Sequence, residues 1–125
     1  MTENEISYAI RGAIFKVYNN LGPGLLESVY EFALVFELRE GGLNVECQRP
    51  FPVVYKGNIL ETGFRLDLIV ENKVIIEIKS VEQLADIHHK QLLTYLKVTG
   101  VKLGLLVNFN ASDLKGSIVR IVNNL

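Results

Sequence analysis

The N-terminal third of the chain repeats apolar side chains at the spacing of an amphipathic helix. The first stripe consists of Ile6, Ile10, Ala13, Ile14, Val17 and Leu21. Thr2, followed three residues later by Glu5, matches a capping box at the start of a helix. A Gly-Pro-Gly segment at residues 22–24 is expected to end this helix, because glycine and proline break helices. The pattern therefore predicts one helix over residues 2–20 and a second over residues 25–40, the second buried on more than one side.

Beyond residue 43 the apolar spacing changes to the alternation of β-strands. Strands are predicted over residues 43–48, 51–55, 64–70, 74–80 and 103–109, with an edge strand over 117–122. The first two are either separate or one strand bent at Pro50. Residues 86–98 are expected to form a helix with Asp86 as its N-cap. Because a strand, a crossover helix and a strand form a parallel pair, the order ααβββαβ predicts an α/β (α+β) fold. It comprises one domain over residues 1–125, with a mixed four- to five-stranded sheet flanked by helices.

The hairpin over residues 64–79 carries charged side chains at alternate positions. Since side chains alternate along a strand, Arg65 and Asp67 share one face, and Glu77 and Lys79 share one as well. A three-residue loop would place Asp67 opposite Glu77 and Arg65 opposite Lys79, whereas a two-residue loop would put the two carboxylates on opposite sides of the sheet. The other face is expected to be core and contains Leu66, Leu68, Val70, Val74, Ile76 and Ile78.

Two interpretations of these charged residues remain open from the pattern alone. Carboxylates directly opposite each other repel, and an otherwise apolar hairpin tolerates such a pair when a cation lies between them. The oxygen ligands of Asp67 and Glu77 suit Mg²⁺ or Mn²⁺. A solvated cluster of ion pairs among the same residues, with Arg65 and Lys79, needs no metal.

The spacing of Asp67, Glu77 and Lys79 resembles the D-x(n)-(D/E)-x-K signature of the PD-(D/E)xK nuclease superfamily, although Leu66 replaces the proline of the strict motif. The segment Gly-Leu-Leu-Glu-Ser-Val-Tyr at residues 24–30 is similar to the GxxExxY motif, which names a family of small bacterial and archaeal proteins assigned to that superfamily. The resemblance extends from about Ile6 to Val122. It implies a restriction-endonuclease-like core and a metal-dependent nuclease with a role in DNA repair, recombination or defence.

The resemblance also implies roles for individual residues. The metal ligands would be Glu27, Asp67, Glu77 and the backbone carbonyl of Ile78, and the catalytic residues would be Asp67, Glu77 and Lys79. Substrate contacts would come from Tyr30, Arg65, Gln91 and Tyr95, of which the last two resemble a Q-x-x-x-Y element in RecB-like relatives. The alternative for Glu27 is a favourable interaction with the helix dipole. The alternative for Gln91 and Tyr95 is the polar edge of an amphipathic helix.

Composition narrows the class of protein. Apolar residues make up 49% of the chain and the mean hydropathy is +0.24. A sheet covered on both faces explains this value, and so does a surface reserved for a second copy in a homodimer. The single Cys47 excludes an internal disulfide. The acidic N-terminus lacks a secretory pattern and no apolar run is long enough to cross a bilayer, so a cytoplasmic protein without membrane contact is expected.

Net charge is the observation least favourable to a nuclease. The formal charge of −1 contrasts with the positive surface that binds phosphates in most nucleic-acid-binding proteins. Two hypotheses follow. The first is a nuclease that hydrolyses phosphodiester bonds of nucleic acid, expected to be DNA, with Mg²⁺ or Mn²⁺. The second is a catalytically silent nuclease-fold module that binds nucleic acid or a protein partner.

Overall fold

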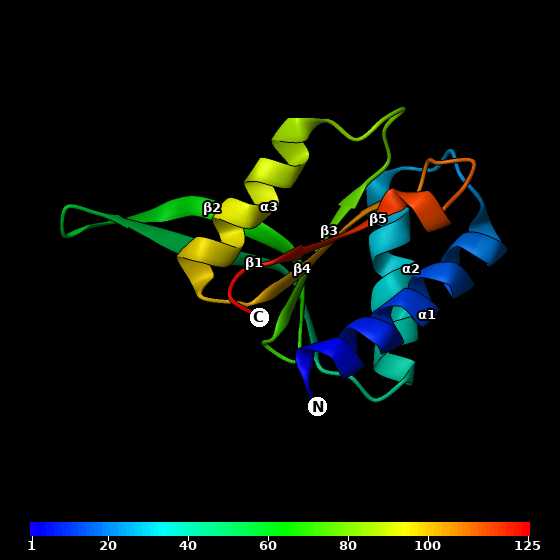
Figure 1. The fold of residues 1–125 in the computed structure, drawn as a ribbon, viewed down its shortest axis with the longest axis horizontal. Coiled ribbons are helices and arrows are strands. Elements are labelled where there is room, and N and C mark those ends of the chain that lie inside the picture. The colour runs from blue at the N-terminus through cyan, green and yellow to red at the C-terminus, as the bar shows by residue number, and fades with distance from the viewer.

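A five-stranded mixed sheet with the order β1-β2-β3-β4-β5 forms the centre of the computed structural model, which describes residues 1–125 apart from the side chain of Thr62 (Figure 1). The helices are α1 (Glu3–Leu21), α2 (Glu27–Glu40) and α3 (Asp86–Thr99). The strands are β1 (Val45–Tyr55), β2 (Asn58–Val70), β3 (Val74–Lys79), β4 (Leu103–Asn108) and β5 (Ile118–Val122), with a 3₁₀ turn at Lys115–Ser117. Only β3 and β4 are parallel, because α3 connects them as a crossover. The expected α+β fold is confirmed.

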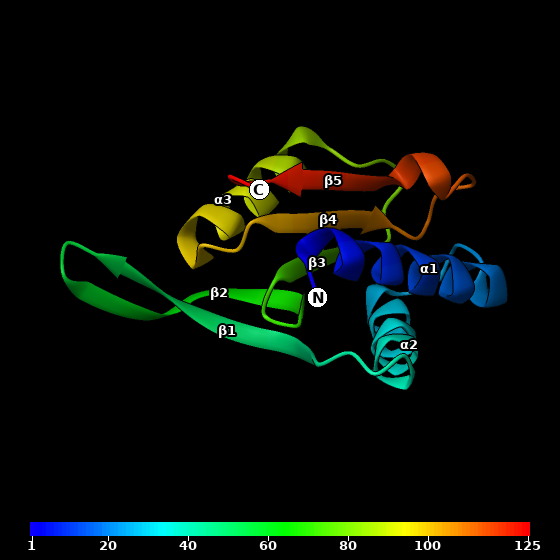
Figure 2. The same cartoon turned by 60° about the horizontal axis from the view of Figure 1, so that its bottom comes forward.

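Helices cover both faces of the sheet (Figures 1 and 2). The larger apolar cluster contains Ile6, Ile10 and Ile14 of α1 and Leu34 and Leu38 of α2, packed on strand residues such as Leu68, Ile76 and Leu105. The smaller cluster contains Leu92 and Leu96 of α3, packed on Leu66, Ile69, Ile75 and Leu106. β3 and β4 lie between the two clusters, which explains why they read as nearly continuous apolar runs.

The helix and strand boundaries follow the sequence patterns, with one open alternative decided and two corrections. β1 is a single strand, and Pro50 is accommodated within it because β1 is at the edge of the sheet. β2 begins at Asn58 instead of residue 64, so β1 and β2 form a long hairpin that extends beyond the sheet (Figure 2). Asp86 is the first residue of α3 and not its N-cap; Ala85 takes that position and its N–H donates to Nδ1 of His88 at 3.0 Å.

The expectation that all even-numbered residues of β2 share one core face is wrong. Leu68 and Val70 pack in the cluster beneath α1 and α2, whereas Leu66 packs in the cluster beneath α3. A strand with regular alternation would place all three on one face. The change of face therefore falls at Asp67, between Leu66 and Leu68.

The core buries only part of the apolar side chains that make up 49% of the chain. Phe32 and Phe36, one helical turn apart on α2, are 77% and 54% exposed. Exposed apolar side chains also occur on the β1–β2 hairpin, at Val54 and Ile59. None of the described helices is long and apolar enough to span a membrane.

Candidate active site

The loop between β2 and β3 has the length on which the proposed site depends. Val70 pairs with Val74, and Leu68 pairs with Ile76, which leaves three residues in the loop and confirms the expected register. This register directs Asp67 and Glu77 toward one another across the two strands. The described ladder between β2 and β3 runs no further than the Leu68–Ile76 pair.

Beyond the last backbone pair of β2 and β3, the side chain of Asp67 bonds to β3. Its Oδ2 accepts a hydrogen bond from the backbone N–H of Ile78 at 2.9 Å, so a side-chain carboxylate replaces a carbonyl of β2 as the acceptor. A regular hairpin would place Arg65 opposite Lys79, but the ladder ends before this level. Arg65 is exposed and pairs with Pro50 on β1.

Glu77 is a buried acid that forms no salt bridge with the residues that the structure describes. Its side chain is 4% exposed, and its Oε1 is buried without a hydrogen-bond partner among the described residues. Burial, and next the negative charge of Asp67, raise the pKa of Glu77 from an ordinary 4.5 to about 9, while the charge of Lys79 acts in the opposite direction. Glu77 therefore keeps its proton near neutral pH in the metal-free protein, which removes the repulsion expected between two facing carboxylates.

Lys79 ends β3, half-buried, and the chain after it is held in place by β4. The carbonyl of Lys79 accepts a hydrogen bond from the N–H of Phe109 at 2.9 Å. Asn108, which is 3% exposed, accepts from the N–H of Val81 at 3.1 Å and donates to the carbonyl of Val81 at 2.9 Å. Sequence reasoning missed Asn108, although a lone polar residue at the end of an apolar strand is a recognisable signal.

The segment at residues 22–30 attaches the turn between α1 and α2 to the end of β3. Ser80, the residue after β3, donates from its N–H to Oε2 of Glu27 at 3.3 Å and from its hydroxyl to the carbonyl of Leu25 at 2.6 Å. Glu27 is exposed and lies at the first position of α2. The Gly24–Tyr30 motif thus has a direct structural connection to the strand that carries Glu77 and Lys79.

Tyr30 has a different environment from the one expected of a substrate contact. Its side chain is fully buried and its ring stacks on that of Phe109, with centroids 4.5 Å apart. Its hydroxyl donates to the carbonyl of Gly22 at 2.6 Å and accepts from the N–H of Leu25 at 3.1 Å. These contacts give Tyr30 a structural role in the turn before Glu27. A buried hydroxyl that already donates one hydrogen bond and accepts another is not available to bind a substrate.

Tyr95 borders the two acids from α3. Burial raises its pKa, and the negative charges of Glu77 and Asp67 raise it further, which is the electrostatic effect of nearby carboxylates. Its ring stacks on Phe64 of β2 with centroids 4.3 Å apart. Gln91 lies one turn earlier on the same helix and is exposed.

Comparison with known proteins shows the family of the chain. The sequence profile described as the PD-(D/E)XK nuclease superfamily matches residues 4–121. The chain belongs to the PD-(D/E)XK nuclease superfamily. Among solved structures, the one titled "Crystal structure of SSO0001" matches this PD-(D/E)XK chain at 27% sequence identity with a TM-score of 0.60. The match covers 79% of this chain and 51% of SSO0001, so the chain spans about half the length of that relative. No curated protein matches the chain.

The donor set fits the divalent metal ion that PD-(D/E)XK nucleases generally use. Asp67 and Glu77 offer carboxylate oxygens, and the unpaired Oε1 of Glu77 lacks the partner that a buried oxygen requires. The N–H and C=O of one strand residue point to the same edge, so the carbonyl of Ile78 is directed to the Asp67 side with its N–H. Among the described residues, no three His, Cys, Asp or Glu side chains form a group able to hold a metal ion. Two carboxylates and a carbonyl leave the remaining positions to water, as Mg²⁺ prefers.

Proposed function

We propose that the protein is a metal-dependent nuclease that hydrolyses phosphodiester bonds of nucleic acid, with DNA as its substrate. The observation that supports the proposal most is the state of Glu77. This residue lies within β3 beside Asp67, and its buried Oε1 has no hydrogen-bond partner among the described residues. A buried acid in this state is costly to the fold. Membership of the nuclease superfamily gives this cost a functional reason, because a divalent ion would bind the ionised carboxylate.

Mg²⁺ or Mn²⁺ is the proposed cofactor, with Asp67, Glu77 and the carbonyl of Ile78 as direct ligands. Glu27 is proposed to act through a water molecule, since its carboxylate already accepts from the N–H of Ser80 at the end of the same strand. When bound, the metal ion lowers the pKa of a water molecule and polarises the phosphate. Displacement of the Glu77 proton is the step that couples metal binding to pH.

The remaining residues have roles that follow from their charge and place. Lys79 lies on the same strand as Glu77, and its ammonium group is proposed to orient the attacking water and stabilise negative charge on the phosphate. Arg65 is exposed on β2 and is proposed to bind a phosphate oxygen. Gln91 and Tyr95 on α3 are proposed to contact the substrate strand beside the site.

The oligomeric state and location complete the proposal. A homodimer is proposed because Phe32 and Phe36 leave an apolar stripe exposed on α2, and because a duplex substrate presents two strands. A cytoplasmic location is proposed because Cys47 is free and exposed, which suits a reducing compartment. The competing function, a silent module that binds nucleic acid or a protein without cleavage, is favoured by one observation, the formal charge of −1.

A cleavage panel with matched variants tests the proposal. Single-stranded, duplex, nicked and branched DNA, and RNA of the same sequences, are incubated with Mg²⁺ or Mn²⁺ and with wild type, Asp67→Ala, Lys79→Ala and two controls. Glu61→Ala changes an exposed acid of the same strand as Asp67, and Lys90→Ala changes an exposed lysine of α3. We expect cleavage in wild type and both controls and a loss of about a thousandfold in the two site variants.

Metal binding separates the nuclease from the silent module. Calorimetry with Mn²⁺ should give binding in wild type and Lys79→Ala but not in Asp67→Ala. Cleavage by Asp67→Ala and Lys79→Ala at a rate close to that of wild type would indicate a contaminating nuclease or another site. Nucleic-acid binding without cleavage or Mn²⁺ binding in wild type would support the silent module instead.

A further inference from the structure

The edge strand β1 has a local irregularity at the level of Asp67. The ladder between β1 and β2 pairs Cys47 with Leu68 and Arg49 with Leu66, and passes over Gln48 and Asp67, which lie between these pairs. Gln48 has a φ of 51°, in the left-handed region that non-glycine residues seldom adopt. Nothing in the local sequence favours this conformation, because glutamine is neither glycine nor asparagine. Such strain persists only where the surrounding structure imposes it.

The irregularity coincides with the change of face in β2. Leu68 packs beneath α1 and α2, whereas Leu66 packs beneath α3, so β2 rotates about its own axis at Asp67. The pairs on either side, Cys47 with Leu68 and Arg49 with Leu66, keep one register, so neither strand has an extra residue here and the irregularity is one of backbone conformation. The left-handed Gln48 thus lies at the level where β2 rotates. The same rotation brings the Asp67 carboxylate to the N–H of Ile78 at 2.9 Å.

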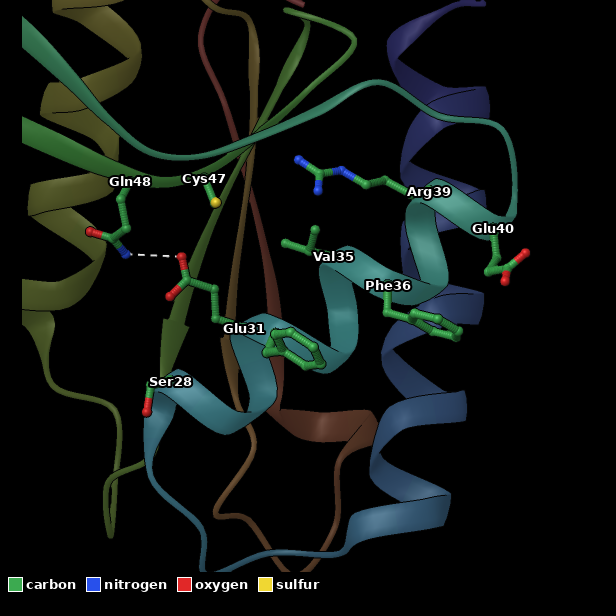
Figure 3. A pocket seen from close by; sticks show the side chains of 9 residues that line it. Ser28, Glu31, Val35, Phe36, Arg39, Glu40, Cys47 and Gln48 are labelled. Carbon is green, nitrogen blue, oxygen red and sulfur yellow. Dashed lines mark hydrogen bonds between the residues drawn. The ribbon is translucent and has the colours of Figure 1, made fainter.

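A contact with α2 holds Gln48 in this position. Its Nε2 donates to Oε1 of Glu31 at 2.9 Å, and Figure 3 shows this bond crossing from β1 to the facing side of α2. Glu31 is half-buried and projects from α2. α2 is therefore hydrogen-bonded to the β1 residue that lies at the level of Asp67, between the two pairs that flank it.

We propose that Gln48 is a positioning residue for the active site: its left-handed backbone, held by Glu31, sets the Asp67 carboxylate against the amide of Ile78 and toward the metal. The catalytic consequence rests on the proposed nuclease function. The placement of Asp67 does not, because the hydrogen bond between Asp67 and Ile78 exists in the metal-free protein. The two parts can be tested separately.

The test exchanges residues by their backbone preference. Gln48→Val places a β-branched residue where φ is positive, which valine strongly resists, whereas Gln48→Gly accepts that conformation freely. The matched control is Glu46, an exposed residue of the same strand in a regular pair with Ile69. There valine is the favourable residue and glycine the unfavourable one, so Glu46→Val and Glu46→Gly should show the opposite order in stability and no change at the site.

The first readout is hydrogen exchange of the Ile78 amide by NMR in EDTA. We expect exchange at least about tenfold faster in Gln48→Val and close to wild type in Gln48→Gly and both Glu46 variants. The second readout is Mn²⁺ affinity by calorimetry, which should fall about tenfold in Gln48→Val but no more than about threefold in Gln48→Gly, because glycine accepts the backbone conformation and loses only the bond to Glu31. Glu31→Ala, which removes only the tether, should weaken Mn²⁺ binding about threefold.

Each outcome decides one part. Equal Ile78 exchange in Gln48→Val and Gln48→Gly would overturn the positioning role, whatever the metal data show. Faster exchange in Gln48→Val alone, in a protein that binds no Mn²⁺ and cuts no nucleic acid, would support the positioning of Asp67 and refute the proposed function. Loss of Mn²⁺ binding in both Gln48 variants would assign the effect to the glutamine side chain and overturn the backbone argument.

Discussion

Replacement of Glu77 by glutamine tests the electrostatics of the site without changing its shape. Glu77 is 4% exposed, and burial and the charge of Asp67 raise its pKa from 4.5 to about 9. Glutamine has nearly the same volume but cannot ionise. In wild type, Glu77 is protonated in the folded state but ionises in the unfolded state near neutral pH. Glutamine has the same charge in both states, so the variant does not have this free-energy cost.

The size and sign of the effect follow from the two pKa values. Because the folded pKa is raised, the stability associated with Glu77 is complete below pH 4.5 and is lost as the pH rises toward about 9. Between these values the loss is about 1.4 kcal/mol per pH unit. At pH 7.5, three units above the ordinary value, the total is about 4 kcal/mol. Glu77→Gln should therefore be more stable than wild type by up to about 4 kcal/mol at that pH, and equally stable near pH 4.5.

Urea unfolding in EDTA at about pH 5, 6, 7 and 8 measures this difference. The variant's advantage should grow with pH, and saturating Mn²⁺ should reverse it, since only wild type gains from the bound ion. Glu61→Gln, at an exposed position of β2, serves as the control and should show no such pH dependence. A Glu77→Gln advantage that is constant from about pH 5 to pH 8, or a variant less stable than wild type, would refute the reasoning.

Three further predictions concern the same site and its supports. The Mn²⁺ affinity of the wild-type protein should rise up to about tenfold per pH unit below pH 9, because the ion displaces the Glu77 proton. Calorimetry in two buffers of different ionisation enthalpy would detect the released proton. If no proton is released, the argument from the raised pKa of Glu77 is contradicted. Tyr30→Phe removes two hydrogen bonds of the turn before α2 and should lower the free energy of unfolding by about 1–2 kcal/mol, measured with urea; an unchanged value would mean the turn is held by other contacts. Asn108→Ala should lower the free energy of unfolding, measured with urea, by about 2–3 kcal/mol, because Asn108 loses both hydrogen bonds to Val81. It should also reduce kcat more than it raises KM, because the chain after Lys79 is no longer held in place. A change in KM alone would contradict a role of Asn108 in positioning Lys79.

The helices, most strands and the three-residue loop of the β2–β3 hairpin were predictable because their causes are local. The capping box at Thr2 and Glu5 forms as the spacing predicts. Alternation within the hairpin, together with the loop length, brought Asp67 and Glu77 to the same level of two adjacent strands. The resemblance of the Asp67, Glu77 and Lys79 spacing to a nuclease signature led to the superfamily that the sequence profile matches.

The state of the site depended on contacts that no local pattern encodes. The burial of Glu77 requires α3 to cover its face of the sheet, and its raised pKa depends on that burial first. The bond from Ile78 to Asp67 requires β2 to leave β3 after Leu68, which a regular alternation does not predict. The family resemblance implied a substrate contact for Tyr30, and only the packing of its ring against Phe109 shows that this side chain is internal.

Sequence alone therefore determined which residues line the two strands and in what register, since backbone geometry and side-chain alternation act over a few residues. The tertiary structure decided which of these residues are desolvated, where β2 rotates at Asp67 and what holds Gln48 in a left-handed conformation. The reason is physical: desolvation and strain are set by segments distant in the chain, such as α2 and α3, that pack over the strand and impose an environment its own residues do not specify.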